Sequence, residues 1–147
     1  MNNPVNSLAI TLFSEVLTAD QLLRNRLSKV LPKGMELSHF SVLNHLAHTT
    51  EEKTPAQLAK SFHVTRGAMS NTLSKLEAAG YIHIRPDWDD ARRKQIAISN
   101  AGRQARDAAV SSIAPMLEAV VKDLGDAKVR AALPILRELR VRLESDD

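Results

Sequence analysis

The chain has 147 residues, of which 44% are hydrophobic and 25% are charged, and it contains no cysteine. A chain of this length and composition folds as one domain, or one domain with extensions, without covalent staples. The lack of cysteine excludes thiolate metal sites, cysteine nucleophiles and thiol redox sensing. Its apolar runs are far shorter than the ~20 residues of a membrane-spanning helix, and the N-terminus lacks the basic start of a secretory signal, so we expect a cytoplasmic protein.

The net charge of +3 is small, but it is unevenly distributed along the chain. Residues 60–106 contain nine Lys and Arg against four Asp and Glu, whereas residues 1–59 contain five of each. Residues 107–147 are slightly acidic, with six basic and eight acidic side chains. Positive charge confined to one segment is typical of a nucleic-acid-binding module, because it attracts the phosphate backbone. The charge distribution therefore predicts a nucleic acid as a partner, and the helix-turn-helix and wing described below narrow this expectation to double-stranded DNA.

The N-terminal third predicts two helices. Between Leu8 and Val30 the apolar residues recur at steps of three and four, which is the helical period, and a second apolar set indicates burial on more than one side. Pro32 and Gly34 end this helix. A shorter helix is expected to begin with Ser38 as its N-cap and to run to about His48.

The next segment predicts a helix-turn-helix. Thr54 before Pro55 is a helix start, because the Thr oxygen can accept a free amide and Pro at the first position loses no hydrogen bond. Thr65 offers a second N-cap for a helix that runs to Ala79 and is ended by Gly80. We expect the apolar side of this second helix to consist of Ala68, Met69, Thr72, Leu73 and Leu76. A short helix, a turn and a second helix with a polar outer face are typical of DNA-binding modules.

The period then changes from helix to strand. Ile82 and Ile84 alternate with polar residues, as do Ile96 and Ile98, so two strands are expected to flank the charged segment PDWDDARRK at positions 86–94. A hairpin that directly follows a helix-turn-helix is the wing of a winged helix domain. The predicted fold class is mainly α, or α+β, with a winged helix-turn-helix at its centre.

Ser99 can cap the last long helical segment, which Gly125 and Asp126 divide in two. Pro115 and Pro134 are expected to bend these helices. The apolar-striped helices at both ends of the chain exceed what a small central domain can cover, so we expect them to pack on a second copy of the chain. The expected division is a dimerisation helix at 1–34, a winged helix DNA-binding domain at 35–99 and dimerisation helices at 100–147.

The run LAKSFHVTRGAMSNTLSKLEAAGYIHIRPDWDDARRKQIAISNAGR resembles the central module of the MarR family of transcriptional regulators. The motifs that carry the resemblance are LEAAGYI after the recognition helix, the wing pattern Asp-x-Arg at Asp90 and Arg92, and IAIS followed by Gly102. The resemblance implies a homodimer that binds palindromic operators, usually as a repressor, and is often released by small aromatic acids. Two positions depart from the family pattern: Trp88 replaces a common Pro in the wing, and Ser99 replaces the usual Thr.

The candidate DNA-binding residues lie on the polar side of the second helix and in the wing. Small polar and basic side chains can donate to phosphates and read base edges in a major groove. In the wing, the carboxylate of Asp90 can hold Arg92 for a narrow minor groove, while Arg93 and Lys94 address phosphates. The alternative is that both are solvated charged surfaces. The candidates are Thr65, Arg66, Ser70, Asn71, Ser74, Lys75, Asp90, Arg92, Arg93 and Lys94.

A site for a small-molecule effector is implied by the resemblance, which places ligands between the winged helix and the dimerisation helices. A carboxylate in that site would meet His39 or Arg24. The alternative is that these are ordinary core and surface residues. The candidates are Phe13, Arg24, His39, Phe40 and Leu43.

Other classes of function fit the sequence less well. His45 and His48 are spaced to face one ion together with His39, but no acidic or cysteine partner completes the set, so we expect no metal and no cofactor. The chain lacks a Gly-rich phosphate loop and a paired nucleophile and base, so we do not expect an enzyme. A helical dimerisation or scaffold protein that does not bind DNA is the alternative, but it would not explain the basic wing.

Overall fold

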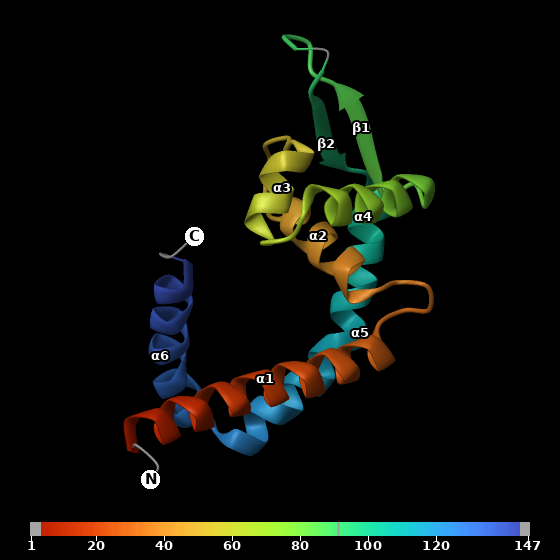
Figure 1. The fold of residues 1–147 in the computed structure, drawn as a ribbon. Helices are drawn as coiled ribbons and strands as arrows, with labels where there is room; N and C mark the ends of the chain where they lie inside the picture. The colour runs from red at the N-terminus through yellow and green to blue at the C-terminus, as the bar shows by residue number, and fades with distance from the viewer. Residues whose placement is uncertain (1–3, 91, 145–147) are drawn as a thin grey trace. The chain divides into compact units, whose positions relative to one another are not determined.

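A computed structural model describes residues 4–90 and 92–144 (Figure 1). It confirms a mainly α fold with a small antiparallel sheet. The elements in chain order are α1 (Pro4–Val30), α2 (Leu37–Ala47), α3 (Pro55–Ser61), α4 (Arg66–Ala78), β1 (Ile82–Pro86), β2 (Lys94–Ile98), α5 (Asn100–Leu124) and α6 (Asp126–Glu144). The chain divides into two compact units between Ser112 and Ile113, within α5. The roles expected for residues 1–34, 35–99 and 100–147 stay predictions.

The predicted caps of α3 and α4 are present. The Thr54 hydroxyl accepts the backbone N–H of Gln57 at 3.1 Å, and the Gln57 side chain accepts the Thr54 N–H at 2.9 Å, so each residue satisfies a free amide of the other. The Thr65 hydroxyl accepts the Ala68 N–H at 3.1 Å and starts α4. Between the two helices, His63 has a φ of 53°, and this left-handed residue reverses the chain. Helix α3 packs directly against α4.

The predicted start of α2 is wrong by two residues. Its N-cap is Glu36, so Ser38 lies inside the first turn. The Glu36 backbone N–H donates to Nδ1 of His39 at 3.2 Å, and this bond closes the turn. In a capping box this N-cap amide is usually accepted by Glu or Gln at the third helical position, and here the His39 ring takes that role.

The core of the winged helix is formed by one face of each of its helices together with the base of the hairpin. Its buried members are Val42, Leu43, Leu46, Leu58, Ala59, Met69, Leu73, Leu76, Ile82 and Ile96. On α4 the expected inward set holds for Met69, Leu73 and Leu76, whereas Ala68 is exposed. Thr72 is half-buried, and Ala68 lies in the first turn of α4.

The hairpin extends away from helices α2 to α4 (Figure 1). Its strands are antiparallel, with Ile82 opposite Ile98 and Pro86 opposite Lys94. Both strands therefore continue one residue into the segment that was expected to be the loop. Lys53 forms an isolated bridge to Ile96, with backbone N···O distances of 3.1 Å and 2.7 Å in the two directions. This bridge ties the base of the wing to the loop in front of α3.

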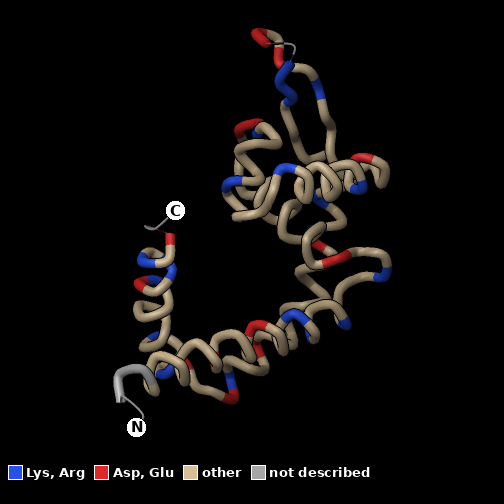
Figure 2. The backbone as a smooth tube through the Cα atoms, in the orientation of Figure 1, with Lys and Arg blue, Asp and Glu red and all other residues tan. Residues whose placement is uncertain are grey.

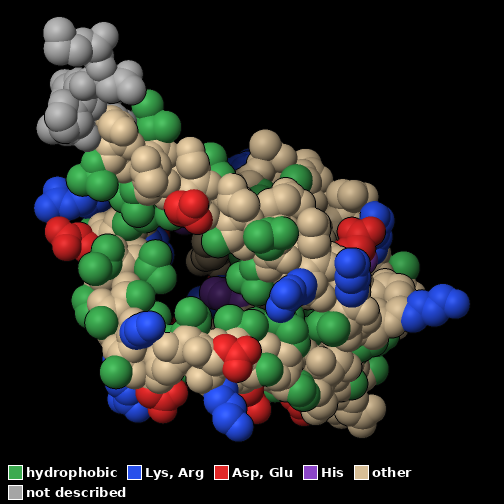
Figure 3. Space-filling view, turned by 90° about the horizontal axis from the view of Figure 1, so that it is seen from below, with side chains coloured by type: hydrophobic (Ala, Val, Ile, Leu, Met, Phe, Trp, Pro, Cys, Tyr) green, Lys and Arg blue, Asp and Glu red, His purple; other side chains and the backbone are tan. Residues whose placement is uncertain are grey.

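The long helices α1, α5 and α6 leave much apolar surface uncovered. Helix α6 has no buried residue among those described. Hydrophobic side chains lie open on the molecular surface, among charged ones (Figure 3). The exposed large hydrophobic residues of these helices are Leu8, Ile10, Leu12, Phe13, Leu17, Leu22, Leu23, Val120, Val121, Leu124, Leu133, Ile135, Leu136, Val141 and Leu143. None of the helices in the described part of the chain is long and apolar enough to cross a membrane.

The start of α5 is locked against the end of α4 and the first strand. The Ser99 hydroxyl accepts the Gly102 N–H at 3.0 Å, as predicted for a cap, and donates to the Gly80 carbonyl at 2.6 Å. Gly102 is buried, and a Cβ there would overlap the carbonyl oxygen of Tyr81 and come within 2.8 Å of Ile98 Cγ1. Only glycine allows the helix to approach the strand this closely.

We expect Gly102→Ala to lower the free energy of unfolding by about 1 to 3 kcal/mol, because the methyl group overpacks a site bounded by backbone. Gly67→Ala is the matched control, since Gly67 lies inside α4 and no atom lies within 4 Å of a Cβ there. The control should gain roughly 0.5 to 1 kcal/mol from the higher helix propensity of alanine. Urea denaturation of both variants measures the difference, and equal stabilities would contradict the close packing.

Candidate nucleic-acid interface

One groove joins the start of α3, the first turns of α4 and the second arm of the wing. It has a volume of about 450 Å³ and is lined by Thr54, Pro55, Ala56, Arg66, Ser70, Arg92, Arg93 and Lys94. Half of these lining residues are cationic, and they come from two segments that are well separated in the sequence. Figure 2 shows basic residues on both arms of the hairpin, below an acidic tip. The fold thus brings the basic wing residues next to the beginning of α4.

The other candidates on α4 form its solvent face. Asn71 and Ser74 are exposed, and Glu77 near the end of α4 is its sole carboxylate. Thr65 is also exposed, but its hydroxyl is engaged in the helix cap. A helix face with small polar side chains and few carboxylates can approach a polyanion without charge repulsion.

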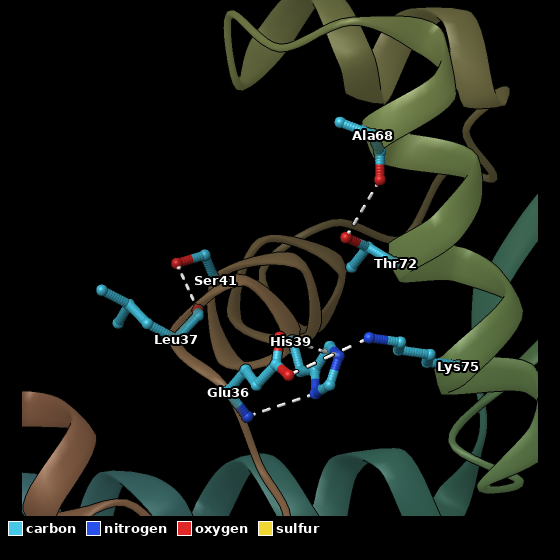
Figure 4. A network of polar contacts seen from close by, with 7 residues as sticks. All are labelled: Glu36, Leu37, His39, Ser41, Ala68, Thr72 and Lys75. Carbon is cyan, nitrogen blue, oxygen red and sulfur yellow. Dashed lines mark hydrogen bonds and ion pairs between the residues drawn. The ribbon is translucent and has the colours of Figure 1, made fainter.

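Lys75 lies outside the groove and is engaged with α2. Its Nζ is 3.9 Å from Oε1 of Glu36, and the second carboxylate oxygen of Glu36 is 3.9 Å from Nε2 of His39 (Figure 4). The His39 side chain is 12% exposed, and its Nε2 is buried without a hydrogen-bond partner. The Glu36 carboxylate therefore links the start of α2 to α4 through Lys75.

The contact between Asp90 and Arg92 that the spacing suggests is present. Oδ1 of Asp90 accepts the Arg92 backbone N–H at 3.0 Å and Nε at 3.2 Å. Arg92 lies in a turn, and the Arg93 N–H donates to the Asp90 carbonyl at 2.9 Å. The Arg92 side chain is 92% exposed and projects into solvent. The carboxylate thus restrains an arginine that remains free to bind a ligand.

The tip of the wing is organised by Asp87. One of its carboxylate oxygens accepts the backbone N–H of Asp89 at 2.9 Å, and the other accepts Nε2 of Gln95 at 3.0 Å. Chiefly because of the Asp89 N–H bond, and next because of the Gln95 amide, the pKa of Asp87 is held below its ordinary value. The Asp87 N–H in turn donates to the Arg93 carbonyl at 3.0 Å. These bonds join the two arms of the hairpin beyond the paired strands.

Arg85 forms an ion pair with Glu52 that was not predicted from the sequence. Nε of Arg85 lies 2.9 Å and 3.1 Å from the two carboxylate oxygens of Glu52, and Nη1 donates to the Pro86 carbonyl at 3.0 Å. The guanidinium carbon also lies 5.9 Å from the ring centroid of Trp88. No local sequence signal pairs Glu52 with Arg85, because the two residues are 33 positions apart.

The effector candidates are placed in different surroundings. Leu43 is fully buried in the core, whereas His39 and Phe40 are half-buried on α2. Phe13 and Arg24 are exposed on α1, where Nε of Arg24 bonds to the Asp20 carboxylate at 3.0 and 3.1 Å. None of the five lines the groove described above. Their role in ligand binding stays a prediction.

The remaining histidines of α2 have structural contacts. His45 packs edge-on against Phe62, with ring centroids 5.3 Å apart, and Nδ1 of His48 lies 2.7 Å from the Asn44 carbonyl oxygen. Within residues 4–90 and 92–144, no three His, Asp or Glu side chains are grouped so that they could hold a metal ion.

These elements, in this order, define a winged helix-turn-helix protein. Residues 33–93 match the model of the MarR family. A solved structure of the transcriptional regulator BldR from Sulfolobus solfataricus has a TM-score of 0.82 and 22% identity, covering 96% of this chain and 99% of that one. A mutant of MarR from E. coli in complex with operator DNA has a TM-score of 0.80 and 21% identity, covering 94% and 99%.

An uncharacterized HTH-type transcriptional regulator of Bacillus cereus is 33% identical over 88 residues. The matched part is 58% of this chain and spans little more than half, 57%, of that relative. The winged helix module of this chain is thus similar to the MarR family in sequence and in fold. BldR and the Bacillus cereus relative are both described as transcriptional regulators.

We expect the Asp87 carboxyl to titrate below the ordinary range, and Gln95→Ala to move its pKa upward by removing one of its donors. Because the pKa is lowered in the folded protein, the contribution of Asp87 to wing stability is present above the ordinary carboxyl pKa. It is lost as the pH falls through the lowered value. An NMR titration measures this pKa, with Gln104→Ala on exposed α5 surface as the control. An unchanged pKa in Gln95→Ala would contradict the assignment.

Proposed function

We propose that this protein is a DNA-binding transcriptional regulator whose groove between α4 and the wing holds the sugar–phosphate backbone of a duplex. The observation that carries the proposal is the convergence of Arg66, Arg92, Arg93 and Lys94 on one groove. Four cations facing one cavity are repelled by each other and attracted by a polyanion. The MarR–operator complex with the same fold supports this partner.

Helix α4 acts as the recognition helix. A major groove is about 12 Å wide and admits an α-helix, whose first turns contact base edges. Ser70, Asn71 and Ser74 lie on the exposed face of α4 and can read those edges. Arg66 lies in the first turn, where its charge and the positive end of the helix dipole both attract a phosphate. Lys75 reaches a phosphate once it leaves Glu36.

The wing carries the second contact. Arg93 and Lys94 in the groove neutralise phosphates, while the solvent-directed Arg92 enters the adjacent minor groove. Asp90 acts as a positioning residue, because it holds the Arg92 guanidinium through a 3.2 Å bond before DNA is bound. Restraining a long side chain in advance reduces the entropy that is lost on binding.

The active form is a homodimer on a palindromic operator. The many exposed apolar side chains of α1, α5 and α6 support this assembly, because a monomer that left them in water would tend to aggregate. Two recognition helices related by a two-fold axis imply half-sites about one helical turn, ~10 bp, apart. Light scattering tests this, and a monomer at micromolar concentration would contradict it.

The protein acts as a repressor that is released by a small aromatic acid. Regulation has to be non-covalent with respect to thiols, because the chain has no cysteine. His39 supports a ligand contact: its Nδ1 accepts the Glu36 N–H, and its Nε2 is buried without a hydrogen-bond partner, 3.9 Å from the Glu36 carboxylate. A ligand carboxylate that displaced Glu36 would supply a partner for Nε2. Such a ligand must favour the conformation that does not bind DNA.

We expect Arg92→Ala to weaken binding to an operator by about 1 to 3 kcal/mol without changing the melting temperature, because the side chain is solvent-exposed. The matched control is Arg140→Ala, which removes the same charge and a comparable exposed ion pair, with Glu144, outside the groove. Fluorescence anisotropy of a labelled duplex selected by the protein from random sequence, measured at several salt concentrations, gives both affinities. An equal loss of operator affinity in the two variants would contradict a role of the wing in DNA binding.

A protein that dimerises but does not bind any duplex at low salt would instead be the helical dimerisation protein considered above. That outcome would also overturn the assignment of the groove.

We expect an aromatic carboxylate such as salicylate or benzoate to release the protein from this duplex in a saturable manner, and His39→Ala to raise the concentration that is needed. Peroxide should have no rapid effect that a thiol reductant reverses. Phe40→Ala and Phe13→Ala test the apolar part of the site, with circular dichroism as the check on folding. Release that is unchanged in all three variants would place the ligand elsewhere.

A further inference from the structure

We propose that Trp88, at the tip of the wing, is a DNA-contacting residue that packs its indole ring against the deoxyribose wall of the minor groove. This inference rests on the proposed function and assigns a specific contact to a residue outside the groove. Trp88 does not line the groove, and its aromatic chemistry differs from that of the cationic lining. The ring would place apolar surface beside the charged contact made by Arg92.

The Trp88 side chain lies almost entirely in solvent. Trp88 is 88% exposed, the largest fraction among the exposed large hydrophobic side chains of residues 4–90 and 92–144. An indole is a large apolar group with one N–H donor, and such side chains gain most when they are transferred from water into an interface. The core of the winged helix gains nothing from Trp88 in this position.

The Trp88 ring is contacted by the Arg85 guanidinium and is otherwise open to solvent. The Arg85 guanidinium carbon lies 5.9 Å from the ring centroid, and Arg85 itself is fixed by Glu52 at 2.9 Å and by the Pro86 carbonyl at 3.0 Å. A stacked cation restrains an exposed aromatic ring, so less conformational entropy is lost when the ring binds.

The tip of the wing adjoins the cationic groove. The neighbouring Asp87 donates its backbone N–H to the Arg93 carbonyl, and Arg93 lines the groove. A duplex seated on the wing arginines therefore has its backbone beside the tip that carries Trp88. Occupation of the groove by DNA and contact by Trp88 are geometrically linked.

The negative charge of the wing tip determines which part of the DNA Trp88 meets. The tip also carries Asp87, Asp89 and Asp90. Asp87 is hydrogen-bonded to a backbone N–H and to Gln95, and Asp90 is paired with Arg92, but all three residues still disfavour a close approach to phosphate. The uncharged deoxyribose faces of a minor groove are the apolar surface that a duplex offers, and apolar side chains are known to enter this groove.

The experiment uses the single tryptophan of the full-length protein as its own reporter. Binding of the selected duplex is followed by anisotropy with a labelled strand, and Trp88 emission is followed in parallel with the unlabelled duplex. We expect the emission maximum to shift to shorter wavelength and acrylamide quenching to fall at the concentration at which the anisotropy rises. Trp88→Ala should weaken binding about tenfold, which corresponds to 1.4 kcal/mol, whereas Trp88→Phe should retain most of the affinity.

The outcomes separate this inference from the proposed function. If the anisotropy rises while Trp88 emission and quenching stay constant, or if Trp88→Ala binds as tightly as the natural sequence, the inference is overturned and the proposed function stands. A blue shift that follows protein concentration in the absence of DNA would show that the ring packs on another copy of the chain, which also overturns it. Absence of any anisotropy change would overturn both.

Discussion

The contact between the base of the wing and the helical core determines the geometry of the candidate interface. Ile82 and Ile96, one from each strand, are buried together with Met69, Leu73 and Leu76 of α4. Because the strands emerge from the same core against which α4 packs, the polar face of α4 and the basic arm of the wing are held on one side of the module. The Lys53 bridge to Ile96 adds backbone hydrogen bonds to this apolar contact.

Two arginines of the wing, Arg85 and Arg92, are linked to the framework in different ways, and these differences suit different tasks. Arg85 is paired with Glu52 and stacked on the ring of Trp88, so its role is to stabilise the wing. Arg92 touches Asp90 but remains open to solvent, which leaves its donors available. Exposed ion pairs of this kind contribute little to stability, and their value lies in orientation. The proposed interface therefore presents charges that are oriented by ion pairs within the wing.

The small network around Glu36 connects α4 to the start of α2. Lys75 of α4 and His39 of α2 both approach its carboxylate, and the Glu36 backbone closes the first turn of α2 (Figure 4). A carboxylate ligand that bound His39 would compete with the Glu36 carboxylate for the imidazole, and through Glu36 it would act on Lys75 of α4. This route needs no large movement, because the groups lie within about 4 Å of each other.

Helix starts and ends, the strand period and the basic central segment followed from the sequence alone, because each depends on residues within one or two turns. Thr54, Thr65 and Ser99 cap as their side chains predict, and Gly80 adopts the positive φ that ends α4. Local patterns did not place the Glu36 cap, the exposure of Ala68 or the pairing of Glu52 with Arg85. They also did not show that Arg66 and Arg92 share one groove. The Glu36 cap is a local contact, but its partner is a histidine, which the usual cap patterns do not include. The pairing of Glu52 with Arg85 and the shared groove depend on which elements pack together, and only the tertiary structure brings side chains from distant segments within a few ångströms.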